Sequence, residues 1–225
     1  MIVKKTPEQI EQMAAAGAIQ ARCLRMLRSK CRPGVTTAEL DEAAHRFILS
    51  QGAEPSFLGY RGFPGSICAS PNSMVVHGIP GQYELKRGDV TPVARRLLNS
   101  TRAALFDAVE QCRAGNHLGD ISSAVQGKVE SSGFSIIRSL VGHGIGRDMH
   151  EDPQIPNYGE PGRGPTLEPG MVLAIEPMVN AGGPEVRVGD DNWAVYSEDG
   201  SLAAHFEFTV AVTDDGPRVL TPWHE

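Results

Sequence analysis

The sequence LKRGDVTPVARRLLNSTRAAL, residues 85–105, joins the end of one structural pattern to the start of another. The residues from Lys86 to Val90 have the composition of a turn that leads into a strand. Thr91 and Pro92 follow at once, and a threonine before a proline is typical of a helix N-cap and the first helical position. A strand after Val90 would therefore have no residues to occupy, and the sequence predicts that a helix begins directly after the turn.

The order of elements before this junction is two helices followed by short strands. Thr6 and Gln9 form a capping box that begins a predicted helix over residues 7–30. A second helix is predicted over residues 37–51 and ends at Gly52. Short apolar pieces between glycines and prolines follow, which is typical of strands and turns.

The same order repeats after the junction. The predicted elements are helices over residues 91–112 and 119–131 and strands within residues 134–142, 171–179, 192–197 and 202–213. The sequence EDG between the last two stretches indicates a hairpin. We interpret the chain as one α+β domain, residues 1–225, with an internal duplication whose halves are about 1–90 and 91–225.

Composition and charge argue against several classes of protein. The 225 residues suffice for a sizeable core, and the net charge of −6 comes without a basic stripe for nucleic acid. No apolar stretch is long enough to cross a bilayer and the N-terminus is polar by residue 4, so we expect no membrane partner and no secretory signal. The four cysteines form no CxxC pair and are expected to be reduced, as in a cytoplasmic protein.

Two glutamates stand in strongly apolar surroundings. Glu176 ends the apolar run MVLAIE, and Glu207 lies within AAHFEFTVAV. A buried carboxylate without a partner costs on the order of several kcal/mol, so each glutamate either lies on a solvated strand face or is paired with a cation. Arg138 and Arg187 are candidate partners, and a bound metal ion is the alternative.

Three histidines stand where strands are expected to end. GHGIGRDMH supplies His143 and His150, and VVHGIP supplies His77. A histidine beside glycine can point its ring into a cleft from a tight turn, although the pattern is also compatible with a surface turn. One imidazole with two carboxylates suits Mn, Fe, Co or Zn better than Ca. The intervals of 33 residues from His143 to Glu176 and 31 residues from there to Glu207 exceed those of local metal motifs, so only the fold can bring these ligands together.

Other chemistries fit the sequence less well. It contains neither a GxSxG nucleophile elbow nor a phosphate-binding P-loop. The glycine-rich GYRGFPG does not follow a strand and open a helix, which argues against dinucleotide binding. Cys68 is an alternative nucleophile beside His77, but no third group that would orient the histidine is visible.

Six motifs occur in one order along the chain. They are PGVTTAELD, LGYRGFPGSICAS, VVHGIP, GHGIGRDMHEDPQIPN, LEPGMVLAIEPMV and GSLAAHFE. Together they resemble the motifs of type I methionine aminopeptidases of the pita-bread metallopeptidase fold, and the match covers nearly the whole chain. The resemblance implies two α/β halves with the site between them, and removal of the N-terminal methionine from nascent polypeptides at the ribosome. We expect a cytoplasmic monomer.

The resemblance also implies roles for individual residues. His143, Glu176 and Glu207 match metal ligands of the family, and Glu176 would also shuttle the proton. His77 and His150 match histidines that contact the substrate and stabilise its scissile group. The positions that match the pocket for the methionine side chain are Tyr60, Phe63, Cys68, His77 and Trp193.

One part of the family pattern is missing. In the family, a pair of antiparallel strands follows GDV and carries two aspartates that bind the metal ions. Here Val90 is followed directly by TPVARRLL, which implies that about 20 residues, two strands and a turn, are absent with both ligands. Asp89 belongs to the preceding turn and Asp107 to the following helix, and neither matches a ligand. We therefore expect at most one metal ion and impaired catalysis. Phe208 is a second departure, because the family usually has a histidine there.

Two alternatives follow from this loss. The chain could be a catalytically inactive relative that binds peptides or proteins through the retained pocket. It could also be an internally deleted form of an active enzyme, whose first half lacks a β-hairpin and which is expected to be poorly soluble because its sheet is interrupted.

Overall fold

The computed structural model describes residues 1–86 and 91–224. Asp89 and Val90 lie outside the described residues, so the absence of a hairpin after them stays a prediction. The helices are α1 (Pro7–Lys30), α2 (Thr37–Ser50), the short 3-10 helix η1 (Tyr60–Gly62), α3 (Pro92–Val109) and α4 (Leu118–Ser131). The strands are β1 (Met74–Val76), β2 (Ser135–Ile136), β3 (Val141–Gly144), β4 (Glu151–Pro156), β5 (Val172–Ile175), β6 (Met178–Asn180), β7 (Val186–Val188), β8 (Val195–Ser197), β9 (Ala203–His205), β10 (Phe208–Thr213) and β11 (Gly216–Val219).

The four long helices begin where the sequence predicts. Thr6 and Gln9 form the expected capping box of α1, and Thr36 and Glu39 form an equivalent one at α2. The start of α3 is also confirmed, because Thr91 Oγ1 accepts a hydrogen bond from the Ala94 N–H at 3.2 Å. These side chains satisfy backbone donors that have no partner within the first helical turn.

Three of the predicted apolar stretches are divided into separate strands, and the first of them, 134–142, gives β2 and the start of β3. The stretch 171–179 forms β5 and β6, which are interrupted at Glu176 and Pro177. The stretch 202–213 forms β9 and β10, which are interrupted at Phe206 and Glu207. Proline has no N–H to donate to a ladder, which explains the break at Pro177. Both glutamates singled out in the sequence therefore lie at interruptions of strands rather than within them.

The strands form three antiparallel sheets, with the orders β1-β8-β7, β11-β10-β5-β3-β4 and β2-β6-β9. The hairpin predicted at EDG is therefore wrong, because β8 pairs with β1 and β7 whereas β9 pairs with β6. The Asp199 carboxylate accepts hydrogen bonds from the N–H groups of Gly183 and Ser201, each at 2.9 Å. The turn is thus held by its own side chain and leads the chain from one sheet to another.

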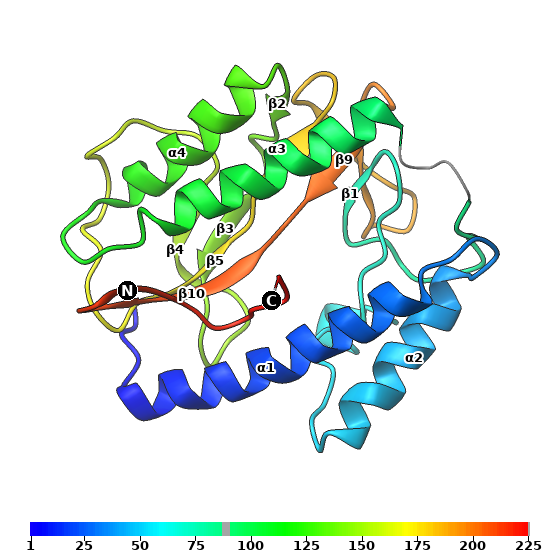
Figure 1. The fold of residues 1–225 in the computed structure, drawn as a ribbon, viewed down its shortest axis with the longest axis horizontal. Coiled ribbons are helices and arrows are strands. Elements are labelled where there is room, and N and C mark those ends of the chain that lie inside the picture. The colour runs from blue at the N-terminus through cyan, green and yellow to red at the C-terminus, as the bar shows by residue number, and fades with distance from the viewer. Residues whose placement is uncertain (87–90, 225) are drawn as a thin grey trace.

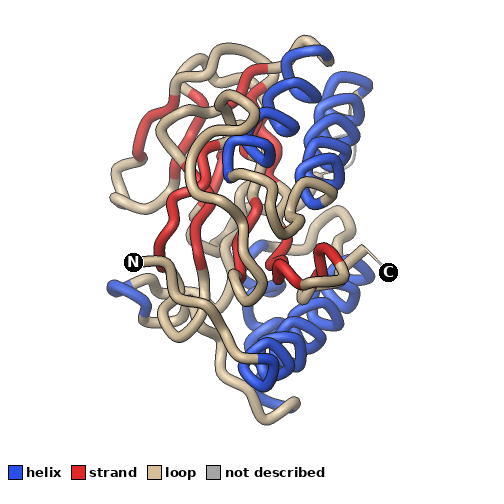
Figure 2. Tube along the Cα trace, turned by 90° about the vertical axis from the view of Figure 1, so that its left-hand side faces the viewer, coloured by secondary structure: helices blue, strands red, loops and turns tan. Residues whose placement is uncertain are grey.

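Helices cover both faces of the five-stranded sheet (Figures 1 and 2). Leu173 and Val210 belong to the main apolar cluster, together with side chains of α3 and α4. On the opposite face, Ile10 of α1 packs in a second cluster with Val172 and Ala211. Because both faces are covered, every residue of β5 is buried, which accounts for the continuous apolar run before Glu176.

A buried ion pair fixes the N-terminal segment to the start of β4. Lys5 Nζ lies 2.5 Å from Glu151 Oε2 and donates to the carbonyl of Val3 at 2.9 Å, and the two charged side chains are only 6% and 11% exposed. The Lys5 side chain crosses over Gly146, where a Cβ atom would collide with it. Since Glu151 directly follows His150, the ion pair also helps to hold the loop that carries this histidine.

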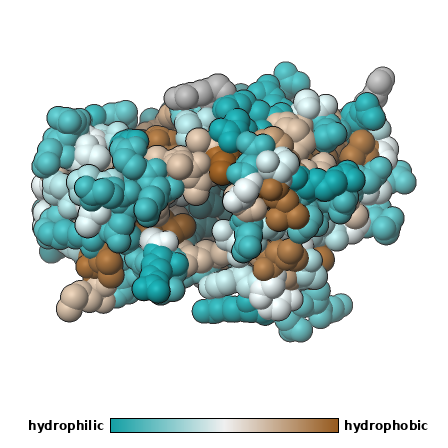
Figure 3. All heavy atoms as spheres, turned by 90° about the horizontal axis from the view of Figure 1, so that it is seen from below, coloured by the Kyte–Doolittle hydropathy of each residue, from teal (hydrophilic) through white to brown (hydrophobic). Residues whose placement is uncertain are grey.

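Apolar side chains reach the surface at separate places. Figure 3 shows them as small brown areas on a mostly hydrophilic face that is hollowed near its middle. The large exposed ones are Met1, Val3, Leu24, Leu49, Leu58, Val93, Leu98 and Val188. Within residues 1–86 and 91–224, no helix has both the length and the apolar run that crossing a membrane requires.

Candidate metal centre and active site

Three adjacent strands bring the predicted metal ligands to one end of the five-stranded sheet. β10, β5 and β3 are neighbours, and Phe208 at the start of β10 pairs with Ile175 at the end of β5. Glu207 directly precedes β10, Glu176 directly follows β5, and His143 lies in β3. The fold therefore gathers residues that are far apart in the sequence.

The carboxylate of Glu176 lies between two imidazoles. His143 Nε2 is 3.5 Å from Glu176 Oε1, and His205 Nε2 is 3.5 Å from Glu176 Oε2 and 3.9 Å from Glu207 Oε2. Among the described residues, Glu176, His205 and Glu207 form a group whose ligand atoms all lie within 4.8 Å of one another, and His143 borders this group on the Glu176 side.

His205 is not among the candidate ligands that the sequence motifs indicate. A signal for it was present, because alternate residues of an extended chain point to the same side, and His205 precedes Glu207 by two positions.

The donor set fits a divalent metal ion. His143 Nδ1 lies 2.8 Å from the carbonyl of Gly144, which can only accept, so Nδ1 carries the proton and Nε2 keeps its lone pair toward Glu176. His205 Nε2 is buried and has no hydrogen-bond partner. Imidazole nitrogens beside carboxylate oxygens are a donor combination that Mn, Fe, Co and Zn accept.

The two arginines that were candidate partners of the glutamates lie elsewhere. Arg138 Nη2 is 3.8 Å from Glu130 Oε1, and its guanidinium lies over the ring of Tyr158. Arg187 lies over the ring of Tyr196. Neither arginine is therefore the cation expected beside Glu176 or Glu207.

Two residues of the centre, Glu207 and His205, have raised pKa values. The surrounding protein atoms, and then the charge of Glu176, raise the pKa of Glu207, although its side chain is 43% exposed on its open side. Burial by itself would lower the pKa of His205, but the interactions with Glu176 and Glu207 outweigh it and raise this pKa overall. Protons therefore compete with a metal ion for these side chains. The affinity for the metal is expected to decrease as the pH is lowered.

Main-chain contacts hold the two glutamates in position. Asn157 Nδ2 donates to the carbonyl of Glu176 at 3.0 Å, and Trp223 Nε1 donates to that of Glu207 at 2.7 Å. Phe208 is fully buried, and its ring stacks on Trp223 with centroids 4.9 Å apart. Phe208 therefore packs into the core and helps to fix Glu207 through Trp223.

Two further histidines lie beside the centre. The Tyr60 hydroxyl is 2.9 Å from His150 Nδ1, and the rings of His143 and His150 have centroids 4.3 Å apart. Burial, followed by the neighbouring His143, lowers the pKa of His150, and burial likewise lowers the pKa of His77. Both imidazoles are consequently neutral at pH 7, and each can donate or accept a hydrogen bond.

Most of the residues predicted to line a pocket form one aromatic cluster. Its members are Phe57, Tyr60, Phe63, His77 and Trp193. The ring centroids of Phe63 lie 4.9 Å from Phe57 and 5.0 Å from Trp193, with edge-to-face geometry. Phe57 was not predicted. Its ring occupies the middle of the cluster, and its centroid lies 5.7 Å from that of the His77 ring.

Cys68 is not prepared to act as a nucleophile. Its side chain retains exposure, yet the protein around it, and then the charge of Glu207, raise the pKa of Cys68 to about 12. Because the thiolate is the reactive form, the thiol is inert near pH 7. The cysteine-nucleophile alternative is therefore disfavoured, whereas a place in the lining of the pocket stays a prediction.

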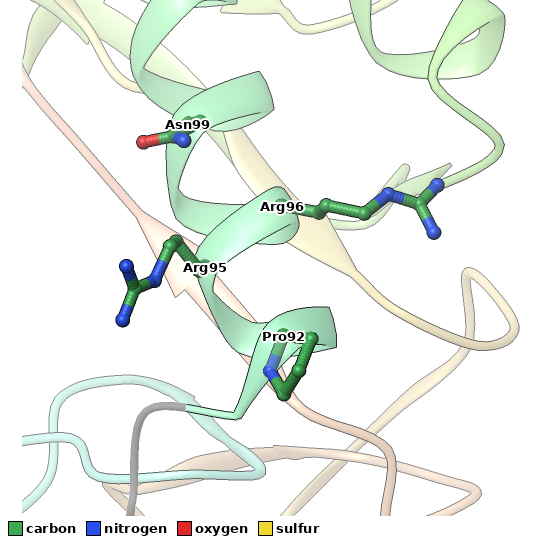
Figure 4. Close-up of a pocket in the computed structure, with 4 residues that line it drawn as sticks. All are labelled: Pro92, Arg95, Arg96 and Asn99. Atoms are coloured by element: carbon green, nitrogen blue, oxygen red, sulfur yellow. The ribbon is translucent and has the colours of Figure 1, made fainter.

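A pocket of about 390 Å³ lies away from these residues, at the first turns of α3. It is lined by Pro92, Arg95, Arg96 and Asn99, and Figure 4 shows the two arginine side chains pointing to opposite sides of the helix. Arg96 donates to the carbonyl of Ser132 and lies over the ring of Phe134. The two guanidinium groups do not converge on one ligand, so this pocket offers no competing active site.

Comparison with known proteins identifies the family. The model of metallopeptidase family M24 matches residues 11–93 and 90–214. The chain belongs to metallopeptidase family M24. Methionine aminopeptidase 1 of Bacillus subtilis is 46% identical over 246 aligned positions, which cover 98% of this chain and 99% of that protein. Methionine aminopeptidase of Escherichia coli is 40% identical, with 96% of this chain and 92% of that protein covered.

Solved structures of family members have the same fold. The methionine aminopeptidase of Rickettsia prowazekii superposes with a TM-score of 0.96 at 38% identity and covers 98% of this chain and 100% of that chain. That of Thermotoga maritima gives 0.95 at 38% identity and covers 98% and 99%. The prolidase of Pyrococcus horikoshii, with a TM-score of 0.76 at 19% identity and coverage of 98% and 64%, shares the fold. The resemblance to type I methionine aminopeptidases and the pita-bread fold are thereby confirmed, and this M24 chain is methionine aminopeptidase-like.

Proposed function

We propose that this chain removes the N-terminal methionine from nascent polypeptides in a metal-dependent hydrolysis. The observation that carries the proposal is the convergence of Glu176, Glu207 and two imidazoles at one end of the sheet, with the aromatic cluster connected to them through His150 and Tyr60. Methionine aminopeptidases that cover almost the whole chain support the assignment of the substrate.

The residues that would hold a divalent ion are His143, Glu176 and Glu207, and Mn, Fe, Co or Zn suits these donors. When bound, such an ion polarises the scissile carbonyl and acidifies water. Glu176 would accept the proton of the attacking water and pass it to the leaving amine. His77 and His150 are neutral near pH 7, so each can donate a hydrogen bond to the scissile group without carrying charge into the site.

We propose that the aromatic cluster binds the substrate side chain. Aromatic rings bind a thioether through favourable sulfur contacts as well as through burial of apolar area. Tyr60, Phe63, Cys68, His77 and Trp193 are the residues that we propose to contact the methionine side chain. Tyr60 also hydrogen-bonds His150, which would couple occupation of the pocket to the position of this histidine.

We further propose that the strand pair with both aspartate ligands is absent, so that at most one ion binds and turnover is slow. Two observations support this. The alignment with the Bacillus subtilis relative has 246 positions, and this chain has only 225 residues, so at least 21 positions face no residue of this chain. The family model also matches in two segments that meet at residues 90–93, next to the junction.

We propose that the protein acts in the cytoplasm as a monomer, with nascent chains at the ribosome as its partners. The chain would be a single domain of two halves, about residues 1–90 and 91–225. The helix pairs support the division, since α1 and α2 share one apolar cluster whereas α3 and α4 contribute to another.

Methionine release from a Met-Ala-Ser peptide tests the function. We expect slow release with Mn²⁺ or Co²⁺ and none with a chelator, because the metal supplies the Lewis acid. The matched control is a Leu-Ala-Ser peptide, which tests whether the pocket selects the thioether side chain. No release at any metal concentration from protein with a cooperative unfolding transition would contradict the proposal.

A catalytically inactive peptide-binding relative is the second candidate, because the aromatic cluster is complete while the aspartate ligands are predicted to be absent. Calorimetry with the same peptide separates the two functions. Binding without release of methionine would favour the binding module. An accidentally deleted form of an active enzyme is tested by sequencing the source DNA across codons 88–92.

A further inference from the structure

The Nε2 atom of His205 lies between the carboxylates of Glu176 and Glu207 and has no hydrogen-bond partner. This atom is buried and makes no hydrogen bond, although carboxylate oxygens of Glu176 and Glu207 lie 3.5 and 3.9 Å away. A buried imidazole nitrogen without a partner is costly, and in native proteins such an atom calls for an explanation by an ion, a water molecule or a catalytic role.

The backbone fixes this placement. Met178 in β6 pairs with His205 in β9, and Phe208 in β10 pairs with Ile175 in β5. The two interrupted segments therefore run side by side across both breaks, with Glu176 in one and His205 and Glu207 in the other. These contacts do not depend on the side chains, so the juxtaposition is a property of the fold.

The distances suit a shared ion better than a direct hydrogen bond. An N–H···O hydrogen bond has a length of about 2.7–3.2 Å, which is shorter than both separations. Ligand atoms about 2.0–2.2 Å from one tetrahedrally coordinated ion lie roughly 3.4 Å apart. The separations of 3.5 and 3.9 Å, with all three ligand atoms within 4.8 Å, are close to that value.

We propose that His205 is a direct metal ligand through Nε2, and that Glu176, His205 and Glu207 form a single-ion site in which a second histidine stands in for the missing aspartates. The proposal rests on the proposed metal-dependent function and adds a ligand to it. His143, whose Nε2 lies 3.5 Å from Glu176 Oε1, remains the first histidine ligand of this site. The competing explanation is an imidazolium that only neutralises the two carboxylates and binds no metal.

Pulsed EPR of the Mn²⁺-loaded protein tests the proposal, since it detects nitrogen atoms bound directly to the ion. The variants are His205→Gln and His143→Gln, and His117→Gln at the start of α4 is the matched control. We expect a nitrogen coupling that persists in His143→Gln. We expect His205→Gln to lose its own coupling and to bind Mn²⁺ about tenfold or more weakly in calorimetry, while His117→Gln matches the unchanged protein.

The possible failures can be told apart. Complete loss of nitrogen coupling in His143→Gln, with unchanged Mn²⁺ affinity in His205→Gln, would overturn the role of His205 and leave metal-dependent function intact. Absence of Mn²⁺ binding by the unchanged protein would overturn both. If His205→Gln does not fold, His205→Asn, which keeps a side-chain amide of smaller size, replaces it in both measurements, and loss of coupling and affinity is again expected.

Discussion

Insertion of the strand pair that we propose to be absent, between Val90 and Thr91, is expected to raise the rate of methionine release by on the order of 10²–10³-fold. The insert is the segment of about 20 residues that follows the counterpart of Val90 in the Bacillus subtilis relative. The resemblance implies that this segment carries two aspartates. A second metal ion contributes several kcal/mol of transition-state stabilisation, and each ~1.4 kcal/mol changes a rate tenfold.

The matched control for this insertion carries the same segment with both aspartates replaced by asparagine. It supplies the strands without the charges, so it is expected to improve folding and solubility while leaving the rate near that of the unchanged chain. Steady-state release of methionine with saturating Mn²⁺ measures all three proteins. Equal rates in the unchanged chain and the aspartate-containing insertion would show that the two aspartates are dispensable here.

Replacement of Glu151 by glutamine is expected to lower the free energy of unfolding by about 3–5 kcal/mol, because it leaves the Lys5 ammonium buried without its counter-charge. Both side chains are nearly inaccessible, and Lys5 retains only the carbonyl of Val3 as a partner. Urea denaturation monitored by tryptophan fluorescence gives the difference. The control is Glu11→Gln, which breaks the exposed pair with Arg218 and should change stability far less.

The same ion pair predicts a pH dependence. Burial by itself would raise the pKa of Glu151, but the hydrogen bonds from Lys5 and from the Asp148 N–H, together with the charge of Lys5, lower it overall. A lowered folded-state pKa contributes stability that is fully present above the ordinary value of 4.5 and is lost as pH falls through the folded-state pKa. Glu151→Gln should lack this loss on the acid side, and equal acid-side slopes in the two proteins would refute it.

The helices could be predicted from the sequence because their signals are local. Thr6, Thr36 and Thr91 each cap a helix with a hydrogen bond to a residue only three positions away. The apolar runs likewise located strands. The pairing of those strands could not be read in the same way, and the predicted EDG hairpin is wrong because β9 pairs with β6 and β8 pairs with β7 and β1.

In the candidate site, too, local sequence signals could be predicted, whereas contacts between distant segments could not. His143, Glu176 and Glu207 were proposed from motifs, and their proximity depends on β3, β5 and β10 being neighbours, which no spacing encodes. His205 and Phe57 were missed because each acts through partners on other segments. The apolar surroundings of the glutamates indicated them in the sequence, whereas the signal for His205 was its position two residues before Glu207. The importance of His205 comes from one unpaired nitrogen, which only the structure shows.

The central claim is that the chain retains a metal centre for one ion without the two aspartates. Elemental analysis of the folded protein, after equilibration with excess Mn²⁺ and removal of the unbound metal, tests it most directly. The account predicts one manganese ion per chain. Two ions per chain would contradict it, because the described ligands would then have to be supplemented by others that replace both aspartates.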